Sequence, residues 1–458
     1  MSGCIETEMA GDTTGHNSIG RASAETFERA QRVFIDGTTR VTVERDPIPR
    51  YVARGEGAYL IDVDGRRFLD LNGNFTTLIH GHAFPPVVEA VTRQLRSGTS
   101  FSNPTLAEVD LAELICERVP GSATIRFVNT GSEAVLFAIK AARAYTGKPA
   151  IAKIEGAYHG CYDWVEVSQA STPADWGTAE EPASTPYYCG VPPSVLDDVI
   201  TLRFNDAEGA RRAIARHAHR LAAVLLDPMP SRAGLIEPRK EFVAAINEAC
   251  RANSVLLICD EVLNLRQAYA GASARHGLKP DLFAMGKIIG GGLPIGAVAG
   301  SREVMSVFDA GTKRPLLPQG GTFSANPLSM VAGLAAMQHL DHAALERLEA
   351  LGDRLRTALR RSIANHDAPF SITGIASLFR IHPKPNAPVE FRDTITIPGQ
   401  AAALRELARA FSAAGIILPI AATGSLSTPM TPADVDHVAD TFDRFLAERG
   451  DVIERMKV

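Results

Sequence analysis

Residues 255–262 read VLLICDEV, an apolar run that ends in the two carboxylates Asp260 and Glu261. A second apolar run, LAAVLL, covers residues 221–226, and residues 239–252 between the two have the apolar spacing of a helix. Short apolar strands that alternate with helices are typical of a mostly parallel sheet buried on both faces. The sequence therefore predicts an α/β protein.

The same alternation appears on either side of these runs. Residues 125–128 and 150–154 are expected to be strands, with a helix at residues 133–145 between them. Residues 58–71 (AYLIDVDGRRFLDL) alternate around Asp64 and Gly65, which predicts a hairpin. Further helices are expected at residues 24–35, 87–95, 106–118, 327–340, 343–363 and 432–448, with a strand pair before the last.

The length of 458 residues allows one large domain and one smaller domain, each with its own core. We expect residues 1–25 to be a disordered or arm-like tail and residues 26–75 to begin the small domain. Residues 76–330 are expected to form the large domain, and residues 331–458 the rest of the small one.

Composition argues against several classes of protein. The formal net charge is -5 and the basic residues are scattered, so no nucleic-acid partner is expected. The longest apolar runs are too short to span a bilayer, and residues 1–20 lack an apolar signal-peptide core. The 6 cysteines show no paired spacing of the metal or redox type, which predicts no metal site and favours a reducing cytoplasm.

Two segments carry the strongest chemical signal. Asp260 ends an apolar strand, and ligands of open α/β sheets bind outside the carboxyl ends of the strands. The alternative is an acid that caps the next turn. Lys287 lies in AMGKIIGGGLP, residues 284–294, where apolar flanks indicate partial burial. Burial lowers the pKa of a lysine, as an imine-forming amine requires; the alternative is a surface lysine beside a flexible loop.

A third segment, FVNTGSEA at residues 127–134, passes from a strand into a helix through small residues. The unpaired N–H groups of such a helix start can bind phosphate, although ordinary capping is the alternative. Tyr158, after the strand at residues 150–154, offers an aromatic face or else packs in the core. An acid for a pyridine nitrogen, a lysine for an imine and a phosphate site are the parts that pyridoxal 5'-phosphate (PLP) requires.

The chain resembles the class III PLP-dependent aminotransferases of fold type I, and among them the branch of glutamate semialdehyde aminomutases and β-amino-acid transaminases. The likeness extends from about residue 37 to the C-terminus. It implies a large domain with a central, mostly parallel seven-stranded sheet flanked by helices. It also implies a smaller α+β domain built from the N-terminal arm and the C-terminal segment, and a homodimer with shared active sites. The matching segments are residues 51–70, 125–160, 260–262, 280–300 and 320–327.

The resemblance also implies residue roles. Lys287 would hold PLP as a Schiff base and carry the proton between substrate and cofactor, and Asp260 would pair with the pyridine nitrogen. The other implied cofactor contacts are Gly131 and Ser132 at the phosphate, Tyr158 and Val262 on the two ring faces, Asn205 near the ring, and Thr322 at the phosphate of the neighbouring subunit.

Two departures from the family pattern concern the substrate pocket. Asp227-Pro228 stands where the family usually has Glu-Pro, so one methylene is lost. Residues 263–266 read Leu-Asn-Leu-Arg where Met-Thr-Gly-Phe-Arg or Met-Thr-Ser-Arg is common. Both changes leave the cofactor chemistry intact and put the identity of the substrate in question.

The leading functional prediction is an aminotransferase that acts on small molecules. It would move an amino group from a carboxylate-bearing donor, a β- or other non-standard amino acid included, to an oxo acid or aldehyde. The alternative is an aminomutase, racemase or epimerase of the glutamate semialdehyde aminomutase type, since the motifs are shared. A cofactor-binding regulator would need an added DNA-binding domain, for which the N-terminal tail is too short.

Substrate recognition is predicted from one arginine. Arg40 lies where the resembling enzymes clasp a substrate carboxylate, and a guanidinium suits that bidentate task. The alternative is a solvated arginine in an N-terminal arm. Residues 415–427, where β-amino-acid transaminases carry a second arginine, contain no cationic residue. We therefore expect a donor with a single carboxylate, and poor use of dicarboxylate acceptors unless another basic residue compensates.

Overall fold

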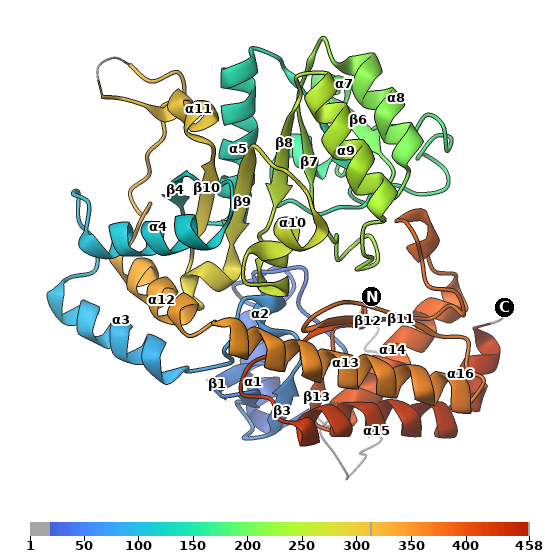
Figure 1. Cartoon of the computed structure of the whole chain (residues 1–458). Helices are drawn as coiled ribbons and strands as arrows, with labels where there is room; N and C mark the ends of the chain where they lie inside the picture. The colour runs from blue at the N-terminus through green and yellow to red at the C-terminus, as the bar shows by residue number, and fades with distance from the viewer. Residues whose placement is uncertain (1–18, 312–313, 457–458) are drawn as a thin grey trace, which may run out of the picture.

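A computed structural model describes residues 19–311 and 314–456. Most of the expected tail at residues 1–25 lies outside the described residues. The first helix, α1 (Arg21–Ala30), begins inside that expected tail and ends before the predicted residue 35. In Figure 1 the largest sheet occupies the upper half of the molecule, and helices α13 to α16 lie below it.

The central sheet has seven strands and is mostly parallel, as predicted. β10 is antiparallel to both of its neighbours, β4 and β9, and the remaining pairs are parallel. The apolar runs at residues 150–154 and 221–226 are strands over those residues, as expected. In order across the sheet, the strands are β4 (Thr124–Val128), β10 (Gly296–Gly300), β9 (Leu282–Gly286), β8 (Leu256–Asp260), β7 (Leu221–Leu226), β5 (Ala150–Ile154) and β6 (Val199–Leu202).

Alternate residues of these strands enter two separate cores. In β8, Ile258 packs into the core that contains the buried side of α5 (Gly131–Thr146). Its neighbours Leu257 and Cys259 pack into the other core, which contains α9 (Lys240–Ala252). Burial on both faces explains why β7 is apolar throughout and β8 is apolar up to Asp260.

Helices cover both faces of the sheet and its lower edge (Figure 1). α12 (Pro327–Gln338) packs on α3 (Pro85–Ser97) and α4 (Leu106–Arg118), and α8 (Ala207–His217) packs on α9. The remaining short helices are α2 (Gly73–Thr76), α6 (Asp163–Glu166), α7 (Pro193–Asp197), α10 (Gly271–His276), α11 (Arg302–Met305), η1 (Asn264–Gln267), η2 (Lys287–Gly290), η3 (Ser306–Phe308) and η4 (Arg392–Thr394).

Two smaller sheets lie in the N-terminal and C-terminal parts of the chain, and the four-stranded sheet joins the two parts. The predicted hairpin, β2 (Tyr59–Asp62) and β3 (Arg67–Asp70), is confirmed, with β1 (Val52–Glu56) added on its outer edge. β13 (Ile416–Ile417) pairs in parallel with β3 and so ties the two ends together. The other elements of this part are β11 (Ser371–Thr373), β12 (Leu378–His382), β14 (Thr423–Ser425), α13 (His342–Asn365), α14 (Pro398–Ala413), α15 (Pro432–Glu448) and α16 (Gly450–Arg455).

This pairing agrees with a small lobe built from both termini, while the exact domain boundaries stay a prediction. Among the helices of the described residues, none is both long and apolar enough to cross a membrane. The part of the chain that the structure describes also contains no group of His, Cys, Asp and Glu side chains suited to a metal ion.

Candidate active site

The ends of several strands converge at one edge of the central sheet. β8 ends at Asp260, and its parallel neighbour β9 ends at Gly286, directly before Lys287. β4 points the same way, because both β4 and β9 are antiparallel to β10. The turn into α5 therefore lies at this edge too, where open α/β sheets bind ligands.

Asp260 is a buried acid held by a second buried side chain. It is 3% exposed, and its Oδ2 lies 2.7 Å from Nδ1 of His159. Its Oδ1 accepts a hydrogen bond from the Val262 amide at 2.9 Å. Burial lowers the pKa of His159, which keeps the imidazole neutral and suits donation from Nδ1. The acid thus caps the turn at Val262, as the alternative proposed, and also faces the site.

Lys287 meets the expectation of a partly buried, perturbed amine. Its φ is +50°, in the left-handed region that few non-glycine residues adopt. Burial lowers the pKa of Lys287, although the carboxylates of Asp260 and Asp227 act in the opposite direction. The glycines that follow are required by packing: a Cβ on Gly291, whose φ is +58°, would lie 2.4 Å from the carbonyl oxygen of Ala332. The surface-lysine alternative is therefore wrong.

The start of α5 packs against the end of β8. A Cβ on Gly131 would lie 2.7 Å from Cγ1 of Val262, so only glycine allows this approach. Thr130 caps the helix by accepting a hydrogen bond from the Glu133 amide at 3.1 Å. The amides of Gly131 and Ser132 lie in the same first turn, where a helix provides no internal acceptor. The start of α5 can therefore be capped by Thr130 and still offer the amides of Gly131 and Ser132 to an anion.

The loop after β5 completes this edge. Tyr158 is 46% exposed, so its ring is not packed in the core of the subunit. Burial of its hydroxyl and the nearby Cys161 thiol raise the pKa of Tyr158 to about 12. The Cys161 amide donates to Oγ of Ser132 at 3.2 Å, which joins this loop to α5. Tyr158, Ser132, Asp260 and Lys287 therefore belong to one group of strand-end residues.

The family follows from comparison with known proteins. A model described as aminotransferase class-III matches residues 41–443. The chain is a class III aminotransferase. A curated relative, glutamate-1-semialdehyde 2,1-aminomutase of Methanothermobacter thermautotrophicus, is 38% identical over 362 residues, which make up 79% of this chain and 83% of that protein.

Solved structures agree with this assignment. An omega-transaminase from Sphaerobacter thermophilus is 47% identical with a TM-score of 0.92, over 94% of this chain and 99% of that one. A transaminase with PLP bound is 38% identical with a TM-score of 0.87, over 96% of this chain and 100% of that one. The aminotransferase is therefore a PLP-dependent enzyme of fold type I.

The residues at the strand ends fit PLP. Asp260 can pair with a protonated pyridine nitrogen, and Lys287 offers an amine whose charge burial disfavours. The first turn of α5 offers backbone N–H groups to a phosphate. His159 Nε2 is buried and has no hydrogen-bond partner among the described residues, as expected beside a site that a further group fills.

Asn205 is placed differently from the other predicted cofactor residues of the aminotransferase. Its Nδ2 donates to the carbonyl oxygens of Glu237 at 3.3 Å and Val389 at 3.0 Å, and its Oδ1 accepts from the Arg239 amide at 2.7 Å. These bonds brace three backbone segments, and none of them reaches Asp260 or Lys287. Its predicted place near the ring gains no support from these contacts and stays a prediction.

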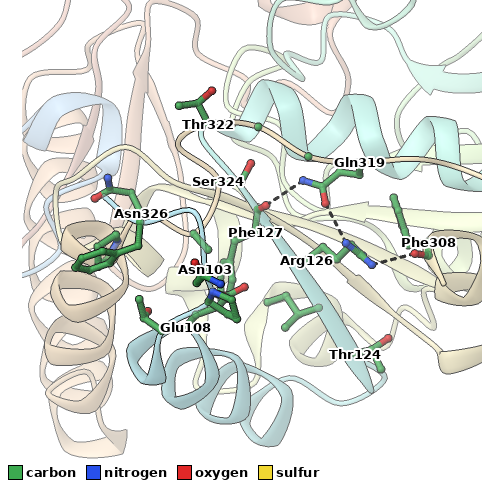
Figure 2. A pocket seen from close by; sticks show the side chains of 18 of the residues that line it. Asn103, Glu108, Thr124, Arg126, Phe127, Phe308, Gln319, Thr322, Ser324 and Asn326 are labelled. Carbon is green, nitrogen blue, oxygen red and sulfur yellow. Dashed lines mark hydrogen bonds between the residues drawn. The ribbon is translucent and has the colours of Figure 1, made fainter. Parts of the chain in front are cut away.

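Thr322 also lies apart from the Lys287 group. It is exposed on a loop that lines a hollow of about 1190 Å³ beside the edge strand β4. Figure 2 shows Thr322 away from the hydrogen-bonded set in which Arg126 donates to Gln319 and to the carbonyl oxygen of Phe308. Among the described residues Thr322 has no hydrogen-bond partner in the Lys287 group, and its predicted role at the phosphate of a neighbouring subunit stays a prediction.

Arg40 is exposed but not freely solvated. Its Nη1 donates to Oδ1 of Asn74 at 3.1 Å, and its guanidinium lies 5.7 Å from the ring centre of Phe75. The segment from Gly73 to Thr76 has four successive positive φ values, and the Thr76 carbonyl oxygen accepts from Nη1 of Arg266 at 2.9 Å. Through this buried arginine the Arg40 segment is connected to the loop after Asp260.

Sequence reasoning missed two parts of the site. His159 was not predicted, although it directly follows Tyr158 in the loop after a strand end. The two departures from the family pattern also meet: Nδ2 of Asn264 donates to Oδ1 of Asp227. Oδ1 of Asn264 in turn accepts from Nε2 of Gln267 at 2.7 Å. Burial and the Asp260 carboxylate raise the pKa of Asp227 well above its usual range.

Proposed function

We propose that this aminotransferase transfers an amino group from a carboxylate-bearing amine to an oxo acid or aldehyde, with Lys287 as its covalent attachment residue for PLP. The observation that carries the proposal is the pairing of a buried acid, Asp260, with a nearby lysine whose pKa burial lowers. When bound, PLP supplies the electron sink that lets the substrate carbon lose a proton. Asp260 would keep the pyridine nitrogen protonated, and Nζ of Lys287 would carry the proton from the substrate carbon to the cofactor.

Further parts of the proposal concern binding. The Gly131 and Ser132 amides bind the phosphate, Tyr158 and Val262 cover the ring faces, and Arg40 holds the substrate carboxylate. Asn205 is kept as a ring-side residue, and Thr322 as a phosphate contact of the partner subunit in a homodimer. A cytoplasmic location and domain boundaries at residues 75 and 330 complete the proposal.

The alternative is an aminomutase, racemase or epimerase, which returns the amino group to the same carbon skeleton. The relative of 38% identity named as an aminomutase supports it. The omega-transaminase of 47% identity covers more of the chain and supports the transaminase function. Shared cofactor residues do not separate the two.

The proposal predicts a yellow protein in which borohydride fixes PLP to the peptide that contains Lys287. Lys287→Ala should abolish turnover, because the proton carrier is lost. Lys279→Ala serves as the control, because Lys279 is an exposed lysine that precedes the opposite end of the same strand, β9. Mass spectrometry of the reduced peptide and assays with single amino donors are the measurements. A fixed cofactor on another lysine would contradict the assignment.

The same assays separate the two functions. An aminotransferase converts a donor continuously only when an oxo acid or aldehyde acceptor is supplied. An aminomutase or racemase turns over without any acceptor. Product formation that does not depend on the acceptor would replace the main proposal by its alternative.

A further inference from the structure

The loop after β7 carries an arginine to the edge of the sheet where the active-site residues gather. β7 lies between β5, which precedes Tyr158, and β8, which ends at Asp260. The loop is closed by a hydrogen bond from the Leu235 amide to the Pro230 carbonyl oxygen at 3.1 Å. Arg232 lies inside this loop and is exposed.

The backbone of this loop is fixed from outside. Nη1 of Arg380, on β12, donates to the Ser231 carbonyl oxygen at 2.8 Å, and Oγ1 of Thr373, on β11, donates to the Gly234 carbonyl oxygen at 2.7 Å. Leu235 has a φ of +53°, a strained value that such anchoring maintains. Arg232 therefore projects from a rigid support, as a binding residue needs.

The guanidinium of Arg232 has no hydrogen bond or ion pair within the described residues. Its charge lowers the pKa of Lys153 and of Arg380, after burial as the main cause, and acts against the raised pKa of Tyr158. The side chain thus lies near Tyr158, where the carboxylate of Glu166 is the opposing charge.

No carboxylate hydrogen-bonds to either neighbouring cation in the part of the chain that the structure describes. Nζ of buried Lys153 donates only to the carbonyl oxygens of Ile154 and Val167, and Nε of Arg380 is buried without a partner. The nearby acid Glu155 is bound by Arg392 at 2.8 Å. The guanidinium of Arg232 beside Tyr158 can therefore bind an anion from solution.

We propose that Arg232 is a carboxylate anchor of the substrate site, on the Tyr158 side. This inference rests on the proposed function and specifies its substrate class: amino acids and oxo acids whose carboxylate reaches this guanidinium. Arg232 supplies the positive charge that residues 415–427 lack, so an oxo acid with two carboxylates has a place for each, at Arg40 and at Arg232.

The test uses the holoenzyme of the wild type, of Arg232→Ala and of Arg232→Lys. Arg239→Ala is the matched control, because Arg239 is an exposed arginine farther along the same connection. The donor half-reaction is followed by the loss of the yellow absorbance, with the amino diacid 3-aminoglutarate and with 3-aminobutanoate, whose single carboxylate Arg40 holds. Calorimetry measures binding of the unreactive diacid glutarate.

Arg232→Ala should lower the rate constant with 3-aminoglutarate by about 10- to 100-fold and weaken glutarate binding by a similar factor, the value of a charge-assisted hydrogen bond. The rate constant of Arg232→Ala with 3-aminobutanoate should be nearly unchanged, and so should both rate constants of the Arg239→Ala enzyme. Arg232→Lys should lose less than Arg232→Ala. Equal losses for both donors, or unchanged carboxylate binding, would overturn the inference. A holoenzyme inert to every donor would reject the proposed function alone, because calorimetry still tests Arg232.

Discussion

Asp260 and His159 form a pair in which each side chain is buried and each depends on the other. The imidazole is the hydrogen-bonding partner of Oδ2, at 2.7 Å, and the remaining oxygen is used by the Val262 amide. Burial lowers the pKa of His159, which disfavours a compensating positive charge on the imidazole. The carboxylate of Asp260 can therefore pair with a protonated pyridine nitrogen.

We therefore expect the loss of the Asp260 charge to lower kcat more than the loss of the His159 side chain that supports it. Asp260→Asn is expected to lower kcat by about 100-fold or more, since the electrostatic partner of the ring is lost. His159→Phe should lower kcat by a smaller factor. His159→Gln, which keeps a hydrogen-bond donor, should lower kcat least. Steady-state kinetics and circular dichroism are the measurements; near-normal turnover by a folded Asp260→Asn enzyme would refute the role.

Local sequence can identify a functional residue when the residues next to it along the chain form a recognisable pattern. Asp260 ends an apolar strand and Lys287 precedes three glycines, so both were predictable from a few residues. The contact of Asn264 with Asp227 joins positions on two different strand ends. Such a pair becomes visible only when the order of β7 and β8 in the sheet is known.

Among the elements, the contact between α5 and the end of β8 is the most restricted. Gly131→Ala would place a methyl group 2.7 Å from Cγ1 of Val262, which must move the helix start or the valine. We expect PLP affinity to fall about tenfold and the free energy of unfolding to fall by about 1–3 kcal/mol. Val262→Ala in the same chain should recover part of the stability by removing the clash.

Spectroscopic titration with PLP and urea unfolding measure these effects. Gly450→Ala is the control, because a Cβ at that helical glycine meets nothing within 4 Å. A Gly131→Ala protein with wild-type affinity and stability would show that α5 can shift without consequence for the site.

Elements differed in how well the sequence predicted them. α15 begins and ends at the predicted residues, because Thr431 and Pro432 mark its start and its apolar spacing is regular. β10 was not predicted: GAVAG contains small residues with little strand preference. β13 is two residues long, and only its pairing with β3 makes it a strand.

At the scale of the whole molecule, the proposed role of Thr322 predicts a site shared between two subunits. Lys287→Ala subunits and Thr322→Asp subunits should each be poorly active alone, the second because a carboxylate repels the phosphate. In a mixed dimer, the Lys287 of one subunit would meet the Thr322 of the other in one intact site. Random pairing should restore about a quarter of wild-type activity.

Co-expression with two different affinity tags isolates the mixed dimer, and sedimentation gives its mass. An active monomer, or a mixed dimer without restored activity, would contradict the shared site. The sequence of a single chain could not reveal this arrangement from its own residues, because the relevant distance lies between two copies.

The place of β10 has a consequence for biosynthesis. β4 hydrogen-bonds to a single strand of the sheet, β10, which begins at Gly296, so the ribosome releases β4 long before its partner exists. Until then β4 is an unpaired edge, which is prone to pair with another chain. The nascent protein can neither protect that edge nor capture its vitamin-derived cofactor until translation has passed residue 300.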